Sequence, residues 1–238
     1  MNVSSIKTNI FNKDDDLCEF IIINLKKGFK EKSVLVVTSK LLSLSLGLTI
    51  SKNNTDKIDL IKSECDHYLG EGLLGHHITI KNNLIMPTAG IDNSNSQNNE
   101  YILLPKQISQ KTKLLHGKLS AHFGFENWGI IFCDSKTSFL RRGVTGTSLS
   151  YYGFQGLVDL KGKKDIFGND LRITTQNRVD PLAAAAVFEM GESDEIRPLV
   201  VITDIDLNFS SSDNSNGDIY LNIKNDLYSP LYVDKIQN

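Results

Sequence analysis

The chain has 238 residues, of which 40% are hydrophobic, and a formal net charge of −2 at pH 7. A chain of this length can bury a sizeable core as one large domain or two small ones. The small net charge gives no electrostatic basis for binding nucleic acid or an anionic membrane. Three widely spaced cysteines without a Cys-x-x-Cys pair favour a reducing compartment. With no signal-peptide core and no apolar run of membrane length, we expect a cytoplasmic protein.

Short strands and helices are predicted in the first quarter of the chain. Ile6–Phe11 has a mixed pattern that allows a short strand. The acidic run Asp14–Asp16 suits a helix N-terminus ahead of Leu17–Leu25. Val34–Val37 is typical of a buried strand that leads into a polar loop starting at Thr38. The segment that follows, 41–48, alternates Leu and Ser and fits either a helix or a strand.

The middle of the chain carries clearer patterns. Residues 56–69 predict a helix, and residues 78–85 predict a hairpin that turns at Asn82-Asn83. Ile108–Phe123 has helical spacing. Gly129–Cys133 predicts a buried strand that ends at Asp134-Ser135.

A helix with well-marked ends is predicted near the C-terminus. Asp180-Pro181 supplies an N-cap carboxylate and a proline in the first turn. The alanine-rich helix runs to Met190 and stops at Gly191, and Leu199–Ile202 predicts one more strand. Strands and helices mix without a regular βαβ repeat, so we predict an α+β fold with mixed or antiparallel sheets. We expect one domain over 1–238, with a core over about 15–202 and an extension over 203–238 that has no assigned role.

The polar loop Ala89–Asn95 lies between two apolar runs and is the first candidate site. Gly90 allows a left-handed turn, and the Asn and Ser side chains can bond their own backbone. Asp92 is the only ionisable group of this loop. A carboxylate among amide and hydroxyl oxygens suits Mg²⁺ or Mn²⁺. The alternative is an ordinary Asx turn.

Several familiar motifs fail on their context. Gly70–Gly75 has dinucleotide-fingerprint spacing, but a strand-like segment follows it where a helix is required, so we predict a turn. The glycines around 156–164 do not form a Walker A loop. Four possible zinc ligands lack paired spacing and are predicted to be surface or core residues: Cys65, His67, His76 and His77. Cys133 follows a buried strand without a nearby histidine and is predicted to be structural.

A set of acids at the ends of predicted elements remains. Asp92 lies in the polar loop, Asp134-Ser135 follows a strand, and Glu192 follows a helix. Ser39-Lys40, after another strand, could contact phosphate. Two basic segments could hold substrate carboxylates or phosphates: Arg141-Arg142 and Lys161–Lys164. The alternative is a set of solvated turns.

These residues lie within motifs that resemble the coenzyme F-420 γ-glutamyl ligase family over roughly Asp15–Ile202. In chain order the motifs are Val-Thr-Ser-Lys (37–40), Ala-Gly-Ile-Asp-Asn-Ser-Asn (89–95), Leu-Leu-Pro (103–105), Asp-Ser (134–135), Arg-Arg-Gly (141–143), Gly-Lys-Lys-Asp-Ile-Phe-Gly (162–168), Asp with an alanine run (180–186) and Met-Gly-Glu (190–192). The resemblance implies an α+β fold, an intertwined homodimer, and a ligase that uses GTP and two divalent cations (Mg²⁺ or Mn²⁺). Its substrates would be L-glutamate and a phosphorylated deazaflavin-type acceptor, coenzyme F-420-0 or a related acid, activated as an acyl phosphate.

The resemblance also implies roles for individual residues. Asp92 and Asp134 would bind one cation, and Ser135 with Glu192 the other. Arg141 is our candidate for the catalytic residue that grips an anionic substrate group. The nucleotide contacts implied are Thr8, Asn9, Ile10, Phe11, Ser39, Lys40, Asn95, Met190, Gly191, Ser193, Asp194, Glu195 and Arg197.

The chain departs from the family pattern at several nucleotide and substrate positions. Charged residues usual in the family are replaced by Leu44, Leu46 and Leu48, and a usual arginine by Ser138. Leucine cannot contact a phosphate, so two alternatives stay open beside the GTP-dependent ligase. One is a non-catalytic relative that binds a nucleotide or metabolite as a sensor or partner protein. The other is a ligase that uses a different nucleotide.

Overall fold

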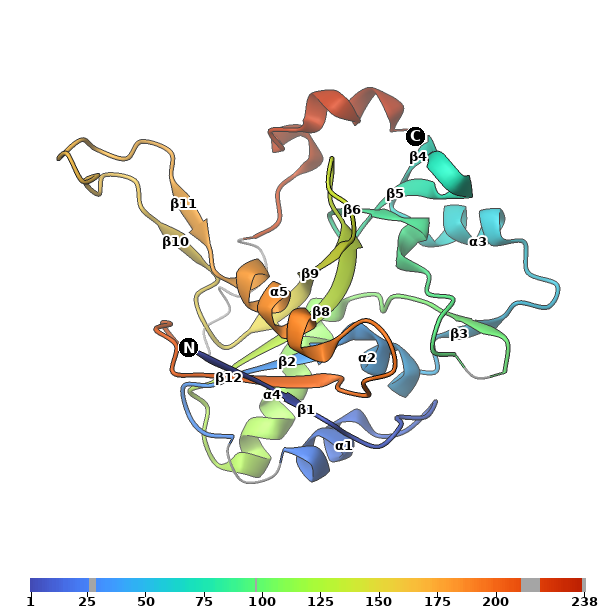
Figure 1. Ribbon diagram of the computed structural model, residues 1–238, viewed down its shortest axis with the longest axis horizontal. Coiled ribbons are helices and arrows are strands. Elements are labelled where there is room, and N and C mark those ends of the chain that lie inside the picture. Colours follow the sequence, from blue (N-terminus) through green and yellow to red (C-terminus); the bar gives the residue numbers. More distant parts are fainter. Residues whose placement is uncertain (26–28, 97, 211–218, 237–238) are drawn as a thin grey trace.

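The fold is seen in a computed structural model that describes residues 1–25, 29–96, 98–210 and 219–236. A five-stranded mixed sheet forms its centre (Figure 1). The β2–β8 pair is parallel, and the other neighbours are antiparallel. In spatial order the strands are β1 (Asn2–Ile6), β12 (Leu199–Thr203), β2 (Val34–Thr38), β8 (Gly129–Thr137) and β9 (Val144–Tyr152).

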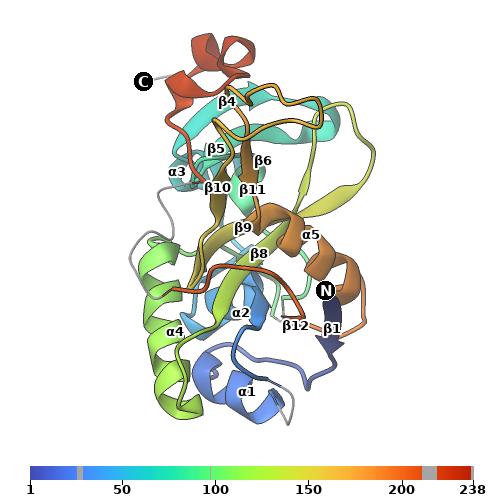
Figure 2. The same cartoon turned by 90° about the vertical axis from the view of Figure 1, so that its left-hand side faces the viewer.

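Both faces of this sheet are buried, because the central strands carry apolar side chains on both sides. Val34 and Val36 of β2 face one core cluster, and Leu35 and Val37 face the other. Helix α5 (Val179–Met190) covers the first face, and the sheet separates it from α4 (Figure 2). The helices on the second face are α1 (Leu17–Asn24), α2 (Ser39–Ser45) and α4 (Ile108–Phe123).

Smaller units surround the central sheet. One is an antiparallel sheet of β4 (His67–Glu71), β5 (His77–Lys81) and β6 (Leu84–Pro87), flanked by α3 (Lys57–Glu64). Short 3₁₀ turns η1 (Leu73–Gly75) and η2 (Thr88–Gly90) follow β4 and β6. The two remaining pairs are β3 (Thr49–Ser51) with β7 (Glu100–Ile102), and β10 (Leu157–Asp159) with β11 (Thr175–Asn177). The β10–β11 ribbon and its connecting loop form an arm that projects from the body (Figure 1).

The C-terminal segment crosses back over the molecule. It contains three 3₁₀ turns, η3 (Ile223–Asn225), η4 (Ser229–Leu231) and η5 (Val233–Lys235), and η5 packs on β4. Tyr220 anchors it by donating a hydrogen bond to the Leu149 carbonyl of β9. No helix in the described parts of the chain is long and apolar enough to cross a bilayer.

Many of the expected elements are confirmed, including the α+β class. Asp16 caps α1 by accepting a hydrogen bond from the Glu19 amide. Helix α4 has the predicted bounds, and β5 and β6 form a hairpin with left-handed Asn82 and Asn83 at the turn. Helix α5 ends at Met190, and Gly191 (φ 80°) allows the chain to leave it.

Three predicted bounds are wrong, and strand pairing decides two of them. The strand over Ile6–Phe11 is wrong: β1 ends at Ile6, opposite Leu199, where β12 begins. The polar loop after Val37 is wrong, since β2 passes directly into α2 at Ser39. The helix over 56–69 ends at Glu64, because the next residues pair with β5.

Two predicted positions in the site region are also corrected. Asp134-Ser135 does not end a strand: both residues lie inside β8, paired with Thr147 and Gly146 of β9. Asp180 is not the N-cap of α5. The Asn177 side chain instead accepts hydrogen bonds from the first backbone amides of that helix, which leaves the Asp180 carboxylate to bind β9.

Candidate active site

One edge of the central sheet brings distant segments together around a cavity of about 510 Å³. Because β2 and β8 are parallel, the end of β2 at Thr38 lies opposite Cys133 of β8, one residue before Asp134. The loop after α5 returns to the same edge, where the Pro198 carbonyl accepts a hydrogen bond from the Thr38 amide (3.1 Å). The N-terminal segment joins this loop through a hydrogen bond from the Thr8 amide to the Ile196 carbonyl (3.1 Å).

The cavity brings most of the predicted site residues together. Fifteen of them line it: Thr8, Asn9, Ile10, Phe11, Lys40, Asn95, Asp134, Ser135, Met190, Gly191, Glu192, Ser193, Asp194, Glu195 and Arg197. Ser39 and Asp92 line a smaller hollow beside it, and this hollow shares Lys40 and Asp134 with the cavity. Arg141 is not among them. It lies exposed in the β8–β9 turn, outside both linings.

Lys40 is the cation at the junction of the two hollows. It lies in the first turn of α2, and its Nζ is 2.6 Å from Asp92 Oδ2. Asp92 Oδ1 accepts two further hydrogen bonds, from the amide and the hydroxyl of Ser94 (2.7 Å each). Burial alone would raise the pKa of Asp92, but Lys40 and the Ser94 donors outweigh it and hold the pKa below its ordinary value.

The carboxyl group of Asp134 has a raised pKa. Burial raises its pKa to about 6, and repulsion from Asp92 and Glu192 adds to the effect. The Ser135 amide, which donates a hydrogen bond to Asp134 Oδ1 (2.9 Å), and the charge of Lys40 act in the opposite direction. The three carboxylates therefore share one electrostatic environment, and an added cation would relieve their repulsion.

The loop that carries Asp92 is bent by an unusual backbone. Thr88, Ala89 and Gly90 all have left-handed φ values (53°, 53° and 67°). This conformation disfavours residues with a Cβ atom, at a cost on the order of 1–3 kcal/mol each. After the turn, the backbone of Asp92 exchanges two hydrogen bonds with Ile102, at 2.9 and 3.0 Å. The geometry of the Asp92 carboxylate thus depends on a short and constrained turn.

The donor chemistry of the site suits a hard cation. Asp92, Asp134 and Glu192 offer carboxylate oxygens and Ser135 a hydroxyl, the ligands that Mg²⁺ and Mn²⁺ favour. In the described parts of the chain, no three acid, His or Cys side chains are already close enough together to hold an ion. The Lys40 ammonium instead balances part of the negative charge.

Some lining residues were not predicted as site residues. They are Thr38, Leu41, Leu44, Ser96, Cys133, Val187, Ile196 and Pro198. Most are apolar or small, so their side chains give no chemical signal in the sequence. Leu44, which departs from the family pattern, also lines the cavity.

The residues of the rejected motifs have ordinary structural environments. Cys133 is buried and burial raises the pKa of its thiol, which disfavours the thiolate form and fits the predicted structural role. The Gly70–Gly75 segment is a strand end and a turn between β4 and β5, with no helix to bind a dinucleotide. Of the candidate zinc ligands, His76 is exposed, Cys65 and His67 are half-buried and His77 is buried.

Comparison with known proteins agrees with this arrangement. Residues 5–204 match the family F420-0:Gamma-glutamyl ligase. The chain belongs to this family. Curated relatives named coenzyme F420:L-glutamate ligase include that of Methanopyrus kandleri, 26% identical over 79% of this chain and 80% of the relative. The relative from Methanococcus maripaludis is 27% identical over 84% and 85%, and that from Haloarcula marismortui is 33% identical over 61% and 56%.

The F420-0:Gamma-glutamyl ligase match covers every segment that lines the cavity. It also includes the strained turn before Asp92 and the β10–β11 arm. The described C-terminal segment, 219–236, lies beyond the matched residues.

Proposed function

We propose that this chain is a GTP- and divalent-cation-dependent ligase that joins L-glutamate through an amide bond to a phosphorylated acid acceptor. The acceptor class is coenzyme F420-0 or a related deazaflavin acid, in keeping with the family and with the names of its relatives. The observation that carries the proposal is the charge cluster at the cavity: Lys40 forms an ion pair with Asp92 beside it, and Asp134 lies within the electrostatic influence of Lys40, Asp92 and Glu192.

The cavity provides contacts suited to a nucleotide. Ser39 and Lys40 start α2, and Lys40 would pair with a phosphate. Backbone and polar groups of Thr8–Phe11, Asn95 and the 190–197 loop surround the remaining space. Asp92 with Asp134 would hold one cation, and Ser135 with Glu192 the second. Bound Mg²⁺ or Mn²⁺ would neutralise the triphosphate and the charge that develops on the transferred phosphoryl group.

The reaction follows in two balanced steps. A carboxylate oxygen of the acceptor attacks the γ-phosphorus of GTP, and the bond to GDP breaks, which yields an acyl phosphate. The amine of L-glutamate then attacks the acyl carbon, the bond to phosphate breaks, and the amine proton passes to solvent. No protein nucleophile takes part, in keeping with the buried, protonated Cys133. The chain's own residues contribute positioning and electrostatic stabilisation.

The second candidate function is binding without turnover, and a specific residue favours it. Leu44 lines the cavity beside Leu41, and neither side chain can contact a phosphate. A chain with this wall could hold a nucleotide or a phosphorylated metabolite as a sensor. Saturable binding of GTP without GDP release in the presence of every acceptor would identify this role.

Release of GDP tests the proposal. Purified protein with Mn²⁺ and GTP is expected to release GDP only when both L-glutamate and the acceptor are present. Asp134→Ala is expected to lower the turnover at least about 100-fold, because it removes a proposed ligand of the cation that would stabilise the transferred phosphoryl group. ATP in place of GTP reports the nucleotide preference in the same assay.

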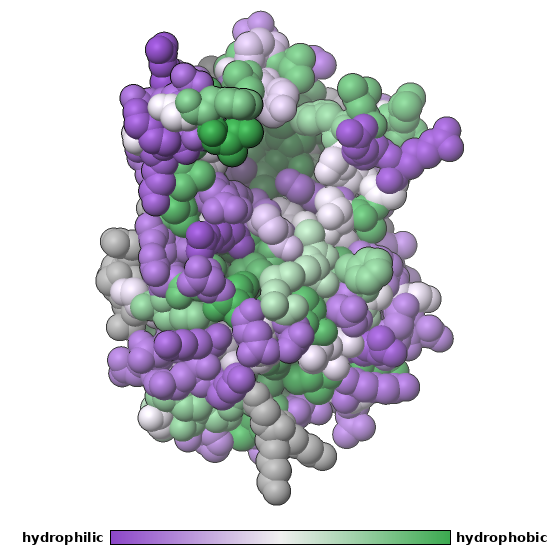
Figure 3. Space-filling model, turned by 60° about the vertical axis from the view of Figure 1, so that its left-hand side comes forward, coloured by the Kyte–Doolittle hydropathy of each residue, from purple (hydrophilic) through white to green (hydrophobic). Residues whose placement is uncertain are grey.

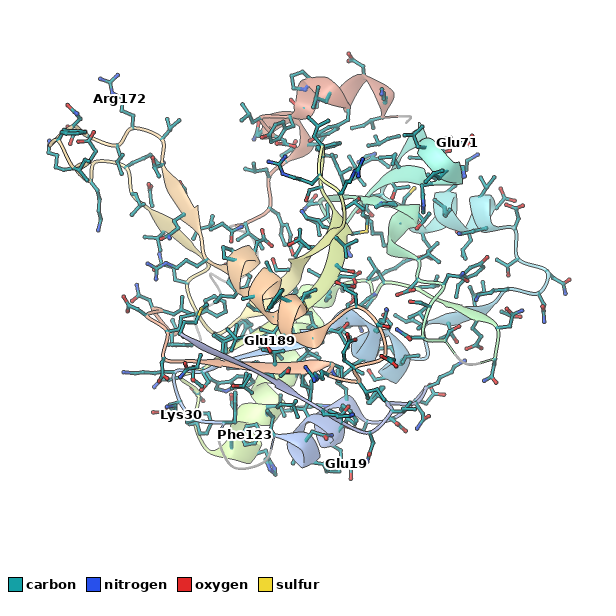
Figure 4. All side chains as sticks on the ribbon, in the orientation of Figure 1. Glu19, Lys30, Glu71, Phe123, Arg172 and Glu189 are labelled. Carbon is teal, nitrogen blue, oxygen red and sulfur yellow. The ribbon has the colours of Figure 1, made fainter. Side chains whose placement is uncertain are left out.

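A matched acid elsewhere controls for the charge change. Glu19 is exposed on α1 (Figure 4) and lines neither the cavity nor the smaller hollow, so Glu19→Ala is expected to retain the activity. Equal turnover of Asp134→Ala and the natural chain, with both folded, would remove the metal assignment. GDP release that does not depend on L-glutamate would contradict the proposed ligase activity.

A further inference from the structure

A single buried hydroxyl ties the strained turn before Asp92 to the neighbouring strand. Thr79 lies on β5 with no exposed surface. Its Oγ1 donates a hydrogen bond to the Met86 carbonyl of β6 (2.8 Å) and accepts one from the Ala89 amide (2.9 Å). One side chain therefore uses its donor and an acceptor site to hold both sides of the β6–η2 junction.

The held segment would not keep this shape on its own. Thr88, Ala89 and Gly90 are three successive left-handed residues, and Thr88 is β-branched, the type least suited to that region. Gly90 cannot be replaced by a residue with a side chain without a clash, since a Cβ atom there would lie 2.3 Å from Leu104 Cδ1. The Thr79 hydroxyl binds the amide at the centre of this run, at Ala89.

The shape of the turn passes directly to Asp92. The Ile91 amide donates to the Thr88 carbonyl (2.9 Å), which closes the turn. Two backbone hydrogen bonds to Ile102 then fix Asp92 itself. With the backbone held at both ends, the Asp92 carboxylate faces Lys40 at 2.6 Å.

We propose that Thr79 is a positioning residue, which keeps the turn in its left-handed form and so presents Asp92 to a divalent cation. The inference rests on the cation role proposed for Asp92. Outer residues that orient metal ligands typically change metal affinity 10–100-fold when they are removed.

Mn²⁺ binding without nucleotide gives the first test. Thr79→Val keeps the side-chain shape but loses both hydrogen bonds, and its dissociation constant for Mn²⁺, measured by the electron paramagnetic resonance of the unbound ion, is expected to rise at least about tenfold. Thr79→Ser keeps the hydroxyl and is expected to bind within about twofold of the natural chain.

Thr112 provides a matched control for the loss of a buried hydroxyl. It has no exposed surface on α4, and its Oγ1 lies 2.7 Å from the Ile108 carbonyl, away from the site. Thr112→Val is expected to lose stability without any change in Mn²⁺ affinity. A similar loss of affinity in Thr79→Val and Thr112→Val would show general destabilisation and overturn the proposal.

Amide hydrogen exchange of the metal-free protein gives a second test that does not need the cation. Thr79→Val is expected to speed exchange at Ile91 and Asp92, whereas Thr112→Val is not. Unchanged exchange there in Thr79→Val overturns the positioning role, even if Mn²⁺ binds well. If the natural chain binds no Mn²⁺, the metal assignment proposed for Asp92 fails, and so does the presentation of Asp92 to a cation.

Discussion

Lys40 occupies the position where charge balance matters most, because its ammonium lies between carboxylates that would otherwise repel one another. It contacts Asp92 at 2.6 Å and lowers the pKa of Asp134 by its charge. A cation that binds these carboxylates must compete with this ammonium. The same side chain becomes available to a phosphate once the cation is bound, so the two ligands are expected to favour each other.

Removal of the Lys40 charge therefore has opposite effects on the two ligands. Lys40→Met is expected to bind Mn²⁺ about tenfold more tightly without nucleotide, since one opposing charge is worth roughly 1.4 kcal/mol in this setting. GTP affinity is expected to fall. Isothermal titration calorimetry measures both constants, with the exposed Lys118→Met on α4 as control. Unchanged Mn²⁺ affinity in Lys40→Met would contradict the competition.

His116 connects the stability of the core to pH. Its ring stacks on Trp128 (4.2 Å between ring centroids), its Nε2 donates to the Trp128 carbonyl (3.1 Å), and Nδ1 lies 3.4 Å from Ser120 Oγ. Ser120 Oγ accepts from the Trp128 indole (2.9 Å), so it can donate to a neutral Nδ1. Burial holds the pKa of His116 below its ordinary value of 6.5, against the effects of the Trp128 carbonyl and Glu126.

The sign of the pH effect follows from that shift. Below pH 6.5 the unfolded chain binds a proton at His116 more readily than the folded chain, so the free energy of unfolding is expected to fall as the pH decreases. Urea denaturation at pH 8 and pH 5.5 measures it. His116→Gln is expected to reduce the difference between the two pH values, whereas the exposed His122→Gln is expected to leave it unchanged. Equal pH dependence in His116→Gln and the natural chain would contradict this account.

At the scale of elements, Asp180 attaches α5 to the central sheet. Its Oδ1 accepts from the amide and hydroxyl of Ser148 (2.9 and 2.7 Å) and from Thr147 Oγ1 (3.2 Å). Its Oδ2 accepts from Asn177 Nδ2 (2.7 Å). One carboxylate therefore satisfies donors on β9 and on the segment that starts α5, and α5 in turn delivers the 190–197 loop to the cavity.

Loss of this carboxylate should destabilise the fold. Asp180→Ala is expected to lower the free energy of unfolding by about 2–4 kcal/mol, because buried donors on β9 lose their acceptor. Asp180→Asn keeps one acceptor oxygen and is expected to lose less. The exposed pair of Asp170 with Lys164 (2.8 Å) gives the control, and Asp170→Ala should change stability by less than about 1 kcal/mol. Urea denaturation compares the three variants, and an Asp180→Ala protein as stable as the natural chain would refute this role.

Elements whose pattern is local could be predicted from the sequence. The valine run of β2 and the helical spacing of α4 are complete within their own residues, and both predictions are confirmed. The end of β1 depends on a distant partner, Leu199. Asp180 likewise binds distant donors on β9 and leaves the N-cap hydrogen bonds of α5 to Asn177, so the local pattern predicted both wrongly.

The site was predictable only in part, for a related reason. Its polar residues belong to recognisable motifs, and the structure brings most of them to one cavity. Spacing could not show that Lys40 pairs with Asp92. The two residues are 52 positions apart, and they follow strands of different sheets, β2 and β6. Apolar wall residues such as Leu41 and Ile196 carry no chemical signal. Of the left-handed run at Thr88–Gly90, the sequence indicated only that Gly90 allows a left-handed conformation.

At the scale of the whole molecule, the arm exposes large apolar side chains to solvent. Ile166, Phe167 and Ile173 of the β10–β11 loop are 93%, 83% and 87% exposed. Phe139 and Leu140, in the β8–β9 turn, are 62% and 98% exposed. Apolar atoms also stand around a hollow on the face drawn in Figure 3. Exposed apolar groups on two projecting hairpins are typical of a surface that another protein covers.

A second copy of the chain is the occupant we propose, in keeping with the intertwined homodimer that the family resemblance implies. Sedimentation velocity at micromolar concentration is expected to show a species of twice 26.5 kDa. Phe167→Asp places a charge in the proposed interface and is expected to shift the protein toward the monomer, because burial of an unpaired carboxylate is costly. Leu114→Asp changes an exposed leucine (66%) on α4, away from both hairpins, and is expected to stay dimeric. A natural chain that sediments at 26.5 kDa would contradict the dimer, and it would leave the apolar arm to a different partner.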